Sequence, residues 1–400
     1  MVFLVISVTI VGILYGYCGW RLLVPARLPY PYSLLAWLSL AALAVLPHTY
    51  ILVIRSSALP GWLRDSVAWL AYVGLGIALL TFSLLLLRDL GWVGWRILEW
   101  LACLFGTGAD TAEAADSLVH HPERRRFLLN AANLGVLALS AAGTGWGMYH
   151  ARRRPRVVHI EVPVRGLPVA FEGFRIVQIT DLHVGPTIKG DFVQAVVDTA
   201  NQLAGDAIAL TGDLVDGSVS HLRPHVEPLA QLRAPFGQYF VTGNHEYYSG
   251  VEEWVAQVRR LGFDVLLNEH RVLRRDGAEL VIAGVTDCSS SNGEGAHVHD
   301  PVAALDGAPA GVRRVLLAHQ PRSVYDARKA GFDLMLSGHT HGGQFAPWKY
   351  LIPLQQPYVA GLHQVEEGSW IYVSRGTGYW GPPVRLTVPS EITCLTLTRV

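Results

Sequence analysis

The chain has 400 residues, with 32 Lys and Arg against 32 Asp and Glu, so its formal net charge is zero. A neutral chain without a basic stripe lacks the electrostatic attraction that nucleic-acid-binding proteins use, and a nucleic-acid partner is not expected. Charged residues make up only 16% of the chain and its mean hydropathy is +0.29, values that point to a membrane part. The four cysteines form no Cys-x-x-Cys unit, which argues against a disulfide framework or a thiolate zinc site.

The apolar residues are concentrated in the first part of the chain. Four uncharged stretches, near residues 1–20, 28–54, 66–87 and 127–150, reach the length of about 20 residues that a membrane-spanning helix needs. Residues 1–156 are therefore predicted to form a transmembrane helical domain, and residues 157–400 a second domain. Between the third and fourth stretches, the Trp-rich segment 91–109 is typical of an interfacial helix lying along a membrane, or of a plain connecting helix.

The orientation in the membrane depends on one local feature. Arginines near the ends of the four stretches divide almost equally between the two sides. The segment ERRRFLLNAANLGVLALSAAG, residues 123–143, resembles a twin-arginine export signal, which predicts a second domain outside the cytoplasm. An ordinary Arg-flanked span would look similar, and the basic run RRRPR at 152–156 favours the opposite orientation.

From residue 157 onward, short β-prone runs alternate with helical patterns. The run FRIVQIT at 174–180 is followed by an amphipathic segment at 190–205 and by AIALT at 207–211. This order of strand, helix and strand predicts an α/β domain. Later strands are expected at 238–241, 279–285, 313–318, 333–337, 370–374 and 392–398, and helices at 251–262 and 321–331.

Five of these predicted strands end in side chains that bind metal ions. In α/β sheets, ligands bind at the carboxyl ends of strands, so these side chains are expected to converge on one edge. The motifs DLHVG, GDLVDG, GNHE, HQP and GHTHGGQ supply, in chain order, Asp181 and His183, Asp213 and Asp216, Asn244, His245 and Glu246, His319, and His339 and His341.

The spacing and residue types within these motifs favour a metal site. Two residues placed two apart on an extended chain face the same way, as in Asp-x-His and His-x-His. The glycines Gly212, Gly243 and Gly338 are expected to let the backbone turn sharply at the strand ends. Asp, Asn and His ligands without Cys suit Mn, Fe or Zn, and the number of candidates fits two divalent ions that share one carboxylate.

The motifs D-x-H, G-D, G-N-H-E, H and G-H-T-H, in this order, resemble those of the calcineurin-like metallophosphoesterases over residues 170–385. The segments FEGFRIVQITDLHVG and HTHGGQ are similar to the membrane-anchored branch of that family, which includes UDP-2,3-diacylglucosamine pyrophosphatase-like proteins. The resemblance implies two facing mixed β-sheets flanked by helices. It also implies that Asp181, His183 and His341 hold one metal, that Asn244, His319 and His339 hold the other, and that Asp213 bridges the two.

The resemblance further implies a dimetal-dependent phosphoesterase. A hydroxide that bridges the metals would attack phosphorus, and His245 would stabilise the transition state or protonate the leaving oxygen. Asp216 and Glu246 are expected either to orient the ligands or to be simple surface polar residues.

The sequence is consistent with three functions. The first is a phosphoesterase that acts on a lipid-linked or membrane-proximal phosphoester or pyrophosphate. The second is the same enzyme acting on a soluble nucleotide or phosphomonoester, and the third is a non-catalytic metal-binding membrane scaffold. The aromatic segment 344–363 is expected either to contact lipid or an acyl chain or to pack under the sheet. The polar loop 288–300 is expected either to form a flexible rim of the site or to carry His297 and His299 as solvated residues, and the solvated state is favoured. The sequence predicts no oligomeric state.

Overall fold

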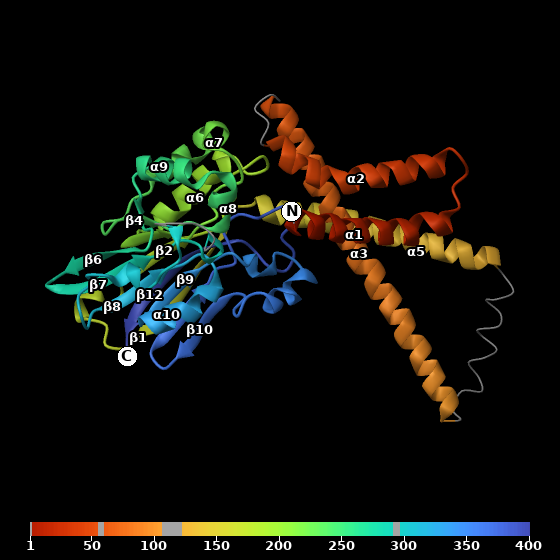
Figure 1. Ribbon diagram of the computed structural model, residues 1–400. Helices are drawn as coiled ribbons and strands as arrows, with labels where there is room; N and C mark the ends of the chain where they lie inside the picture. Colours follow the sequence, from red (N-terminus) through yellow and green to blue (C-terminus); the bar gives the residue numbers. More distant parts are fainter. Residues whose placement is uncertain (1, 55–59, 106–121, 291–296) are drawn as a thin grey trace. The chain divides into compact units, whose positions relative to one another are not determined.

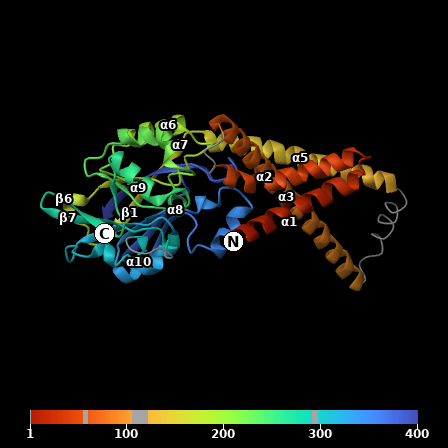
Figure 2. The ribbon, with the colours of Figure 1, turned by 45° about the horizontal axis from the view of Figure 1, so that its top comes forward.

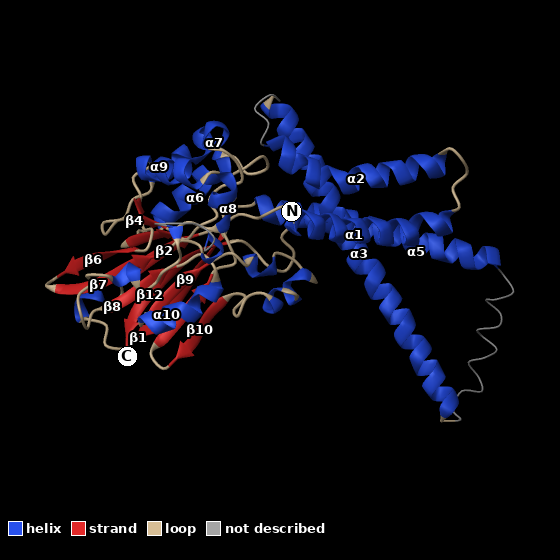
Figure 3. Cartoon of the chain, in the orientation of Figure 1, coloured by secondary structure: helices blue, strands red, loops and turns tan. Residues whose placement is uncertain are grey.

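The computed structural model describes residues 2–54, 60–105, 122–290 and 297–400. By its internal contacts the chain divides into two compact units, Met1–Gly147 and Met148–Val400. Each unit has its own class of structure, because the described residues of the first form helices and those of the second include the strands of two sheets (Figure 3).

The first unit consists of long apolar helices (Figure 1). These are α1 (Val2–Ala26), α2 (Tyr32–Ile54), α3 (Gly61–Leu104) and α5 (Pro122–Arg152), and the last residues of α5 belong to the second unit. All four are long and apolar enough to cross a membrane.

The Trp-rich segment does not form the separate helix that was expected. The third predicted span lies within a longer helix, since α3 continues to Leu104 and includes most of that segment. No proline lies within α3, so nothing in its backbone breaks the helix. The charges that interrupt the apolar stretch are paired, since Asp89 accepts hydrogen bonds from Arg21 of α1 at 2.6 Å and from Tyr17 of α1 at 2.5 Å. Residues 106–109 of the segment lie outside the described part.

The second unit contains two six-stranded sheets flanked by helices, as predicted (Figure 3). The first sheet has the order β1-β12-β2-β3-β4-β5 and the second β10-β11-β9-β8-β7-β6. The strands of the first sheet are β1 (Arg156–Val164), β2 (Arg175–Ile179), β3 (Ala207–Leu210), β4 (Gln238–Phe240), β5 (Asp264–Val265) and β12 (Glu391–Arg399). Those of the second are β6 (Glu269–Arg275), β7 (Ala278–Gly284), β8 (Arg313–Leu317), β9 (Leu334–Ser337), β10 (Gly361–Glu366) and β11 (Ser369–Val373).

Both sheets are mixed, with a parallel centre. In the first sheet, β2, β3, β4 and β5 run parallel, and β12 is antiparallel to β2. In the second, β7, β8, β9 and β11 run parallel, and β6 and β10 are antiparallel additions at the two edges. The carboxyl ends of the central strands of each sheet therefore meet at one edge of that sheet.

Alternate residues of the central strands enter two different cores. Ile176, Ala209 and Tyr239 of the first sheet pack against Ile282, Leu317 and Leu336 of the second, so this cluster fills the space between the sheets. Val177, Ile208 and Leu210 instead face Val193 and Val196 of α6 (Gly190–Gln202) and Trp254 of α9 (Val251–Arg260).

The helices cover the outer faces of the two sheets. Figures 1 and 2 both show α6, α7 (Val219–Val226) and α9 together on one side of the unit, with α10 (Val324–Ala330) on the other. On that other side, Val324 and Ala327 of α10 pack against Leu316 and Met335 of the second sheet. Each sheet is thus buried on both faces, which explains the nearly continuous apolar runs in the sequence.

The close packing between the sheets leads to a stability prediction at Gly284, the last residue of β7. A Cβ atom at this position would lie 2.5 Å from Leu266 Cβ and 2.5 Å from Val241 Cγ1, and both neighbours are fully buried. We expect Gly284→Ala to lower the free energy of unfolding by about 1–3 kcal/mol through overpacking.

Gly190 offers a matched control. Its nearest neighbour would be an ordinary 3.5 Å from an added Cβ, so Gly190→Ala is expected to leave stability unchanged or slightly higher. Thermal unfolding of the detergent-purified protein measures the stability of both variants. Equal unfolding midpoints for Gly284→Ala and the unsubstituted chain would contradict the packing account.

Candidate metal centre

The side chains selected from the sequence come together at the carboxyl ends of five parallel strands. Asp181 and His183 follow β2, Asp213 and Asp216 follow β3, and Asn244 to Glu246 follow β4 at the start of α8 (Asn244–Ser249). His319 follows β8, and His339 and His341 follow β9. Three of these strands belong to the first sheet and two to the second, so the site is built from both.

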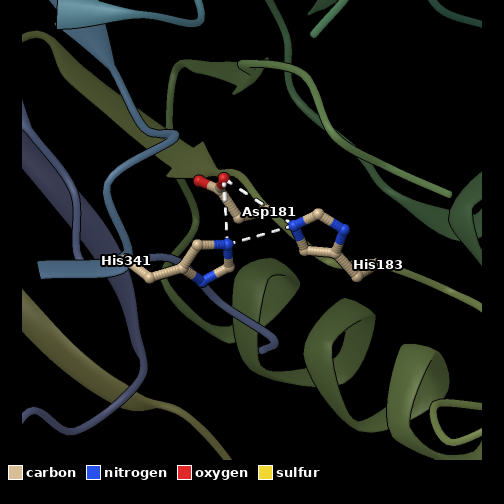
Figure 4. Close-up of side chains that lie close together, drawn as sticks. All are labelled: Asp181, His183 and His341. Atoms are coloured by element: carbon tan, nitrogen blue, oxygen red, sulfur yellow. Dashed lines mark hydrogen bonds and ion pairs between the residues drawn. The ribbon is translucent and has the colours of Figure 1, made fainter. Parts of the chain in front are cut away.

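One group of side chains consists of Asp181, His183 and His341 (Figure 4). The Nε2 atoms of His183 and His341 lie 3.1 Å apart, and Asp181 Oδ1 lies 3.5 Å from His341 Nε2 and 4.0 Å from His183 Nε2. All three residues are buried, and Figure 4 shows the carboxylate and both rings pointing toward one another.

A second group consists of Asp213, His319 and His339. His319 Nε2 lies 3.1 Å from Asp213 Oδ2 and 3.2 Å from His339 Nδ1. Asp213 Oδ2 is also 3.8 Å from His183 Nε2, an atom of the first group. The carboxylate of Asp213 therefore lies between the two groups and contacts both.

The donor atoms of the two groups fit divalent metal ions. His319 Nδ1 donates its hydrogen to the carbonyl of Thr211 at 2.9 Å, so in the neutral ring Nε2 carries a lone pair. His183 Nδ1 is likewise 3.1 Å from a carboxylate oxygen of Asp216. These lone pairs face another histidine nitrogen at 3.1 and 3.2 Å, an arrangement that a bound cation would stabilise. The buried Asn244 side chain adds an Oδ1 atom that has no hydrogen-bond partner among the described residues.

The electrostatics act differently on the members of the two groups. Burial and the neighbouring His319 lower the pKa of His339 to about 3, and burial with His183 lowers the pKa of His341 well below its usual value. Burial opposes ionisation of Asp213, but His319 and His245 outweigh it and hold the pKa of this carboxyl well below its usual value. His339, His341 and Asp213 are thus held in the forms that ligate metals. Burial opposes the charged form of His319, but Asp213 outweighs it and raises the pKa of His319 well above its usual value, and burial raises the pKa of Asp181.

The backbone at the site adopts a conformation that is rare outside glycine. The φ angles of five site residues fall in the left-handed region, between 50° and 69°. These residues are Asp181, His183, Asp213, His339 and His341. Such positions cost free energy and persist where the surrounding structure holds them, which is characteristic of functional sites.

The predicted role of the glycines is correct at one position and wrong at two. Gly212 has a φ of +89°, so it provides the sharp turn. Gly243 and Gly338 do not have positive φ. A Cβ atom at Gly243 would collide with the carboxylate of Asp213, and one at Gly338 with the carboxylate of Asp181. These two glycines make room for the site's carboxylates rather than bend the chain.

Asp216 and Glu246 are parts of the site, since the Asp216 side chain is only 16% exposed and Glu246 is fully buried. Asp216 Oδ1 accepts hydrogen bonds from Nδ1 of His183 at 3.1 Å and from Nδ1 of His245 at 2.5 Å, so one carboxylate orients two imidazoles. Glu246 accepts hydrogen bonds from the backbone N–H groups of Asp213, Leu214 and Gly243 at 3.0, 2.8 and 2.6 Å. It joins the loop after β3 to the loop after β4.

His245 lies at the outer side of these groups. Its Nε2 atom is 3.9 Å from Asp213 Oδ2, and 15% of its side chain is exposed. Burial disfavours its charged form, but the carboxylates of Asp213 and Asp216 prevail and raise the pKa of His245 to about 9. This imidazole is therefore a partly accessible proton donor next to the carboxylate that both groups share.

Sequence reasoning missed Arg385, which supports the site from behind. Its guanidinium is almost fully buried and donates hydrogen bonds to the carbonyls of His341 at 3.0 Å, Arg375 at 2.8 Å and Gly378 at 2.5 Å. The same segment donates the Gly378 N–H to the carbonyl of Asp181 at 2.9 Å. Arg385 thus fixes the backbone of His341 directly and that of Asp181 through Gly378. Its only sequence signal is an arginine in the apolar run PPVRL.

Two loops named in the sequence differ in their outcome. The expectation that His297 and His299 are solvated is wrong: His297 lies 3.0 Å from the hydroxyl of Tyr247, and His299 lies 2.7 Å from the carbonyl of Thr286. Residues 291–296 of that loop lie outside the described part. In the aromatic segment, Tyr350, Leu351 and Leu354 are 69%, 50% and 81% exposed, whereas Tyr358 packs against the core cluster of the second sheet.

Comparison with known proteins identifies the family of the second unit. A family model described as Calcineurin-like phosphoesterase matches residues 174–343. Two vertebrate proteins named "Transmembrane protein with metallophosphoesterase domain" are similar to this chain. The one from Danio rerio is 38% identical over 66% of this chain and 62% of its own length, and the one from Bos taurus is 40% identical over 63% and 59%. The chain thus spans about three fifths of these relatives.

A bacterial relative matches over more of its length. An "Uncharacterized metallophosphoesterase" of Helicobacter pylori strain J99 is 36% identical over 69% of this chain and 73% of that protein. Members of this family use a centre of two divalent metal ions, and the structure has the corresponding groups of metal-binding residues. The chain therefore belongs to the calcineurin-like phosphoesterase family.

Proposed function

We propose that this chain is a membrane-anchored phosphoesterase that uses two divalent metal ions to hydrolyse a phosphoester or pyrophosphate bond of a lipid-linked substrate. The observation that carries the proposal is the position of the Asp213 carboxylate, which contacts donor atoms of both residue groups. A carboxylate that is shared between two sets of imidazoles fits a site for two metal ions.

The site residues divide between the two ions. Asp181, His183 and His341 would hold the first ion, Asn244, His319 and His339 the second, and Asp213 both. The oxygen and nitrogen donors suit Mn, Fe or Zn. When bound, the two ions neutralise the charge of the phosphate and lower the pKa of water toward neutrality. The unpartnered Oδ1 of Asn244 supports its assignment as a ligand.

His245 acts on the group that leaves. Asp216 holds its Nδ1 and so fixes the ring, while the partly exposed imidazole is open to substrate. In this position Nε2 donates a proton to the leaving oxygen as the phosphorus–oxygen bond breaks, and the leaving group departs as an alcohol. Asp216 and Glu246 position the ligands and the loops that carry them.

Membrane attachment favours a lipid-linked substrate. Four helices are apolar and long enough to span a bilayer, and only three residues separate the end of α5 at Arg152 from the start of β1 at Arg156. The exposed side chains of Tyr350, Leu351 and Leu354 belong to the loop that follows the metal-site turn His341–Gly343 and are suited to contact lipid. The resemblance to UDP-2,3-diacylglucosamine pyrophosphatase-like proteins stays a prediction, and a soluble nucleotide or phosphomonoester is the alternative substrate.

The metal requirement can be tested on the full-length protein in detergent. We expect stripping of metal to abolish hydrolysis of bis-p-nitrophenyl phosphate, p-nitrophenyl phosphate or a UDP-linked acylated sugar, and manganese to restore it. Asp213→Asn is expected to reduce turnover beyond the ~10–100-fold that loss of an outer-shell partner costs, because both ions lose a ligand.

Elemental analysis of the same samples measures metal bound per chain. The matched control is Asp198→Asn, which removes an exposed carboxylate on α6. Full turnover by metal-free protein, or by Asp213→Asn, would refute the two-metal proposal. The preferred compound among the three separates the lipid-linked substrate from the soluble alternatives.

The role of His245 predicts a dependence on the leaving group. His245→Asn is expected to lower kcat by about 10²–10⁴-fold for an alkyl ester, whose oxygen needs a proton to leave. The loss for a p-nitrophenyl ester, which leaves without a proton, is expected to be much smaller. Steady-state kinetics on both esters checks this, with His363→Asn on β10 as the control. Equal losses on both esters would contradict proton donation.

We propose that the phosphoesterase domain lies outside the cytoplasm, because segment 123–143 resembles a twin-arginine export signal. We expect a membrane-impermeant maleimide to label Tyr325→Cys, a 57% exposed position on α10, in intact cells. The parent chain without the new cysteine is the control. Labelling that occurs only after the cells are lysed would reverse the proposed orientation.

A further inference from the structure

Two exposed aromatic side chains contact the ring of His245. The ring centroid of Tyr248 lies 5.3 Å from that of His245 with an interplanar angle of 66°, and that of Trp380 lies 5.6 Å away at 73°. Tyr248 belongs to α8, and Trp380 to the loop after β11, more than 130 positions later in the chain. Two separate segments thus bring an aromatic ring to the same histidine.

These rings are not part of the core. Tyr248 is 62% exposed and Trp380 is 49% exposed, and neither belongs to a buried cluster. An exposed aromatic face gains free energy when a ligand removes it from water. Both rings contact a histidine of the metal centre. They therefore differ from Tyr350, Leu351 and Leu354, the exposed side chains that are suited to contact lipid.

The backbone of Trp380 is fixed by a buried glutamine. Gln344 accepts a hydrogen bond from the Trp380 N–H at 3.0 Å, and its amide donates to the carbonyls of Trp380 at 3.1 Å and Pro382 at 2.9 Å. Gln344 follows directly on the metal-site turn His341–Gly343. The turn that carries a metal-site histidine therefore also holds Trp380 in place, as expected for a built binding position.

We infer that Trp380 and Tyr248 bind a flat aromatic ring, a nucleobase or an aryl group, on the part of the substrate that leaves at His245. Aromatic rings pack with centroids about 4.5–7 Å apart, so a ring stacked on Trp380 lies within reach of the His245 imidazole. This inference rests on the proposed function, because it places the leaving group at His245. It narrows the substrate to a phosphoester whose leaving group carries a planar ring.

Binding of phosphonates, which an ester hydrolase does not cleave, tests the inference directly. Isothermal titration calorimetry of the full-length protein in detergent compares benzylphosphonate with ethylphosphonate. The unsubstituted chain is expected to prefer the benzyl compound. Trp380→Ala is expected to reduce this preference about five- to tenfold, the size of one aromatic stacking contact, and Trp380→Phe is expected to retain most of it.

Two further variants distinguish a ring-binding site from a general apolar surface. Trp380→Leu keeps an apolar side chain without a ring, and retention of the full preference in this variant would overturn the inference in favour of the apolar surface. Tyr325→Ala removes an equally exposed aromatic ring on α10 and is expected to change nothing. Equal loss of affinity for both phosphonates in Trp380→Ala would also overturn the inference.

Turnover measured in parallel distinguishes this inference from the proposed function. Hydrolysis of p-nitrophenyl phosphate with no preference for the benzyl compound would overturn the ring site and leave the phosphoesterase intact. A benzyl preference that depends on Trp380, without hydrolysis of any ester, would support the ring site and count against the proposed reaction.

Discussion

The buried carboxylate of Asp213 is the constraint on which the rest of the site depends. An ionised group in a dry interior costs several kcal/mol unless partners compensate for it. Here the nitrogens of His319, His183 and His245 lie 3.1, 3.8 and 3.9 Å from Oδ2, and the backbone N–H of His245 donates to Oδ1 at 2.9 Å. Each partner comes from a different strand end. The partners of this carboxylate come together because parallel strands of both sheets end at the same place. The same arrangement brings the candidate metal ligands together.

The same constraint explains the unusual backbone. Side chains that converge on one point from five strands need loops that turn within one or two residues, and left-handed φ angles at Asp181, Asp213 and His339 provide those turns. Segments must also approach closely, which is possible at Gly243 and Gly338 because they have no side chain. Strain and tight approach are held in place by the buried Glu246 and Arg385, whose hydrogen bonds end on the backbone of the loops and not on solvent. The fold thus stabilises a conformation that its local sequence would not adopt alone.

The site was largely predictable from sequence because its information is local. Each motif directly follows a strand, so a strand pattern plus two or three polar residues is enough to place Asp181, Asn244 or His341 at the shared edge. What could not be predicted depends on distant segments. The bond between Arg385 and His341 spans 44 positions, and that between Asp181 and Gly378 spans 197. The length of α3 escaped prediction for a similar reason, because the pairing of Asp89 with α1 decides that a charged position stays inside a helix.

His245 marks the boundary between two chemical environments. On its inner side it contacts the carboxylates of Asp213 and Asp216, and on its outer side the rings of Tyr248 and Trp380. Gln344 couples these environments, since it extends the turn of His341 and holds the backbone of Trp380. A change in that backbone would therefore disturb the metal-binding turn as well. The two rings differ in their connection to the metal-site residues. Tyr248 also forms a hydrogen bond with the side chain of Asn244, so its substitution would reach a residue of the metal centre. Trp380 contacts the site through its ring packing on His245, and its side chain is therefore the one that can change with the smaller effect on the residues that would hold metal.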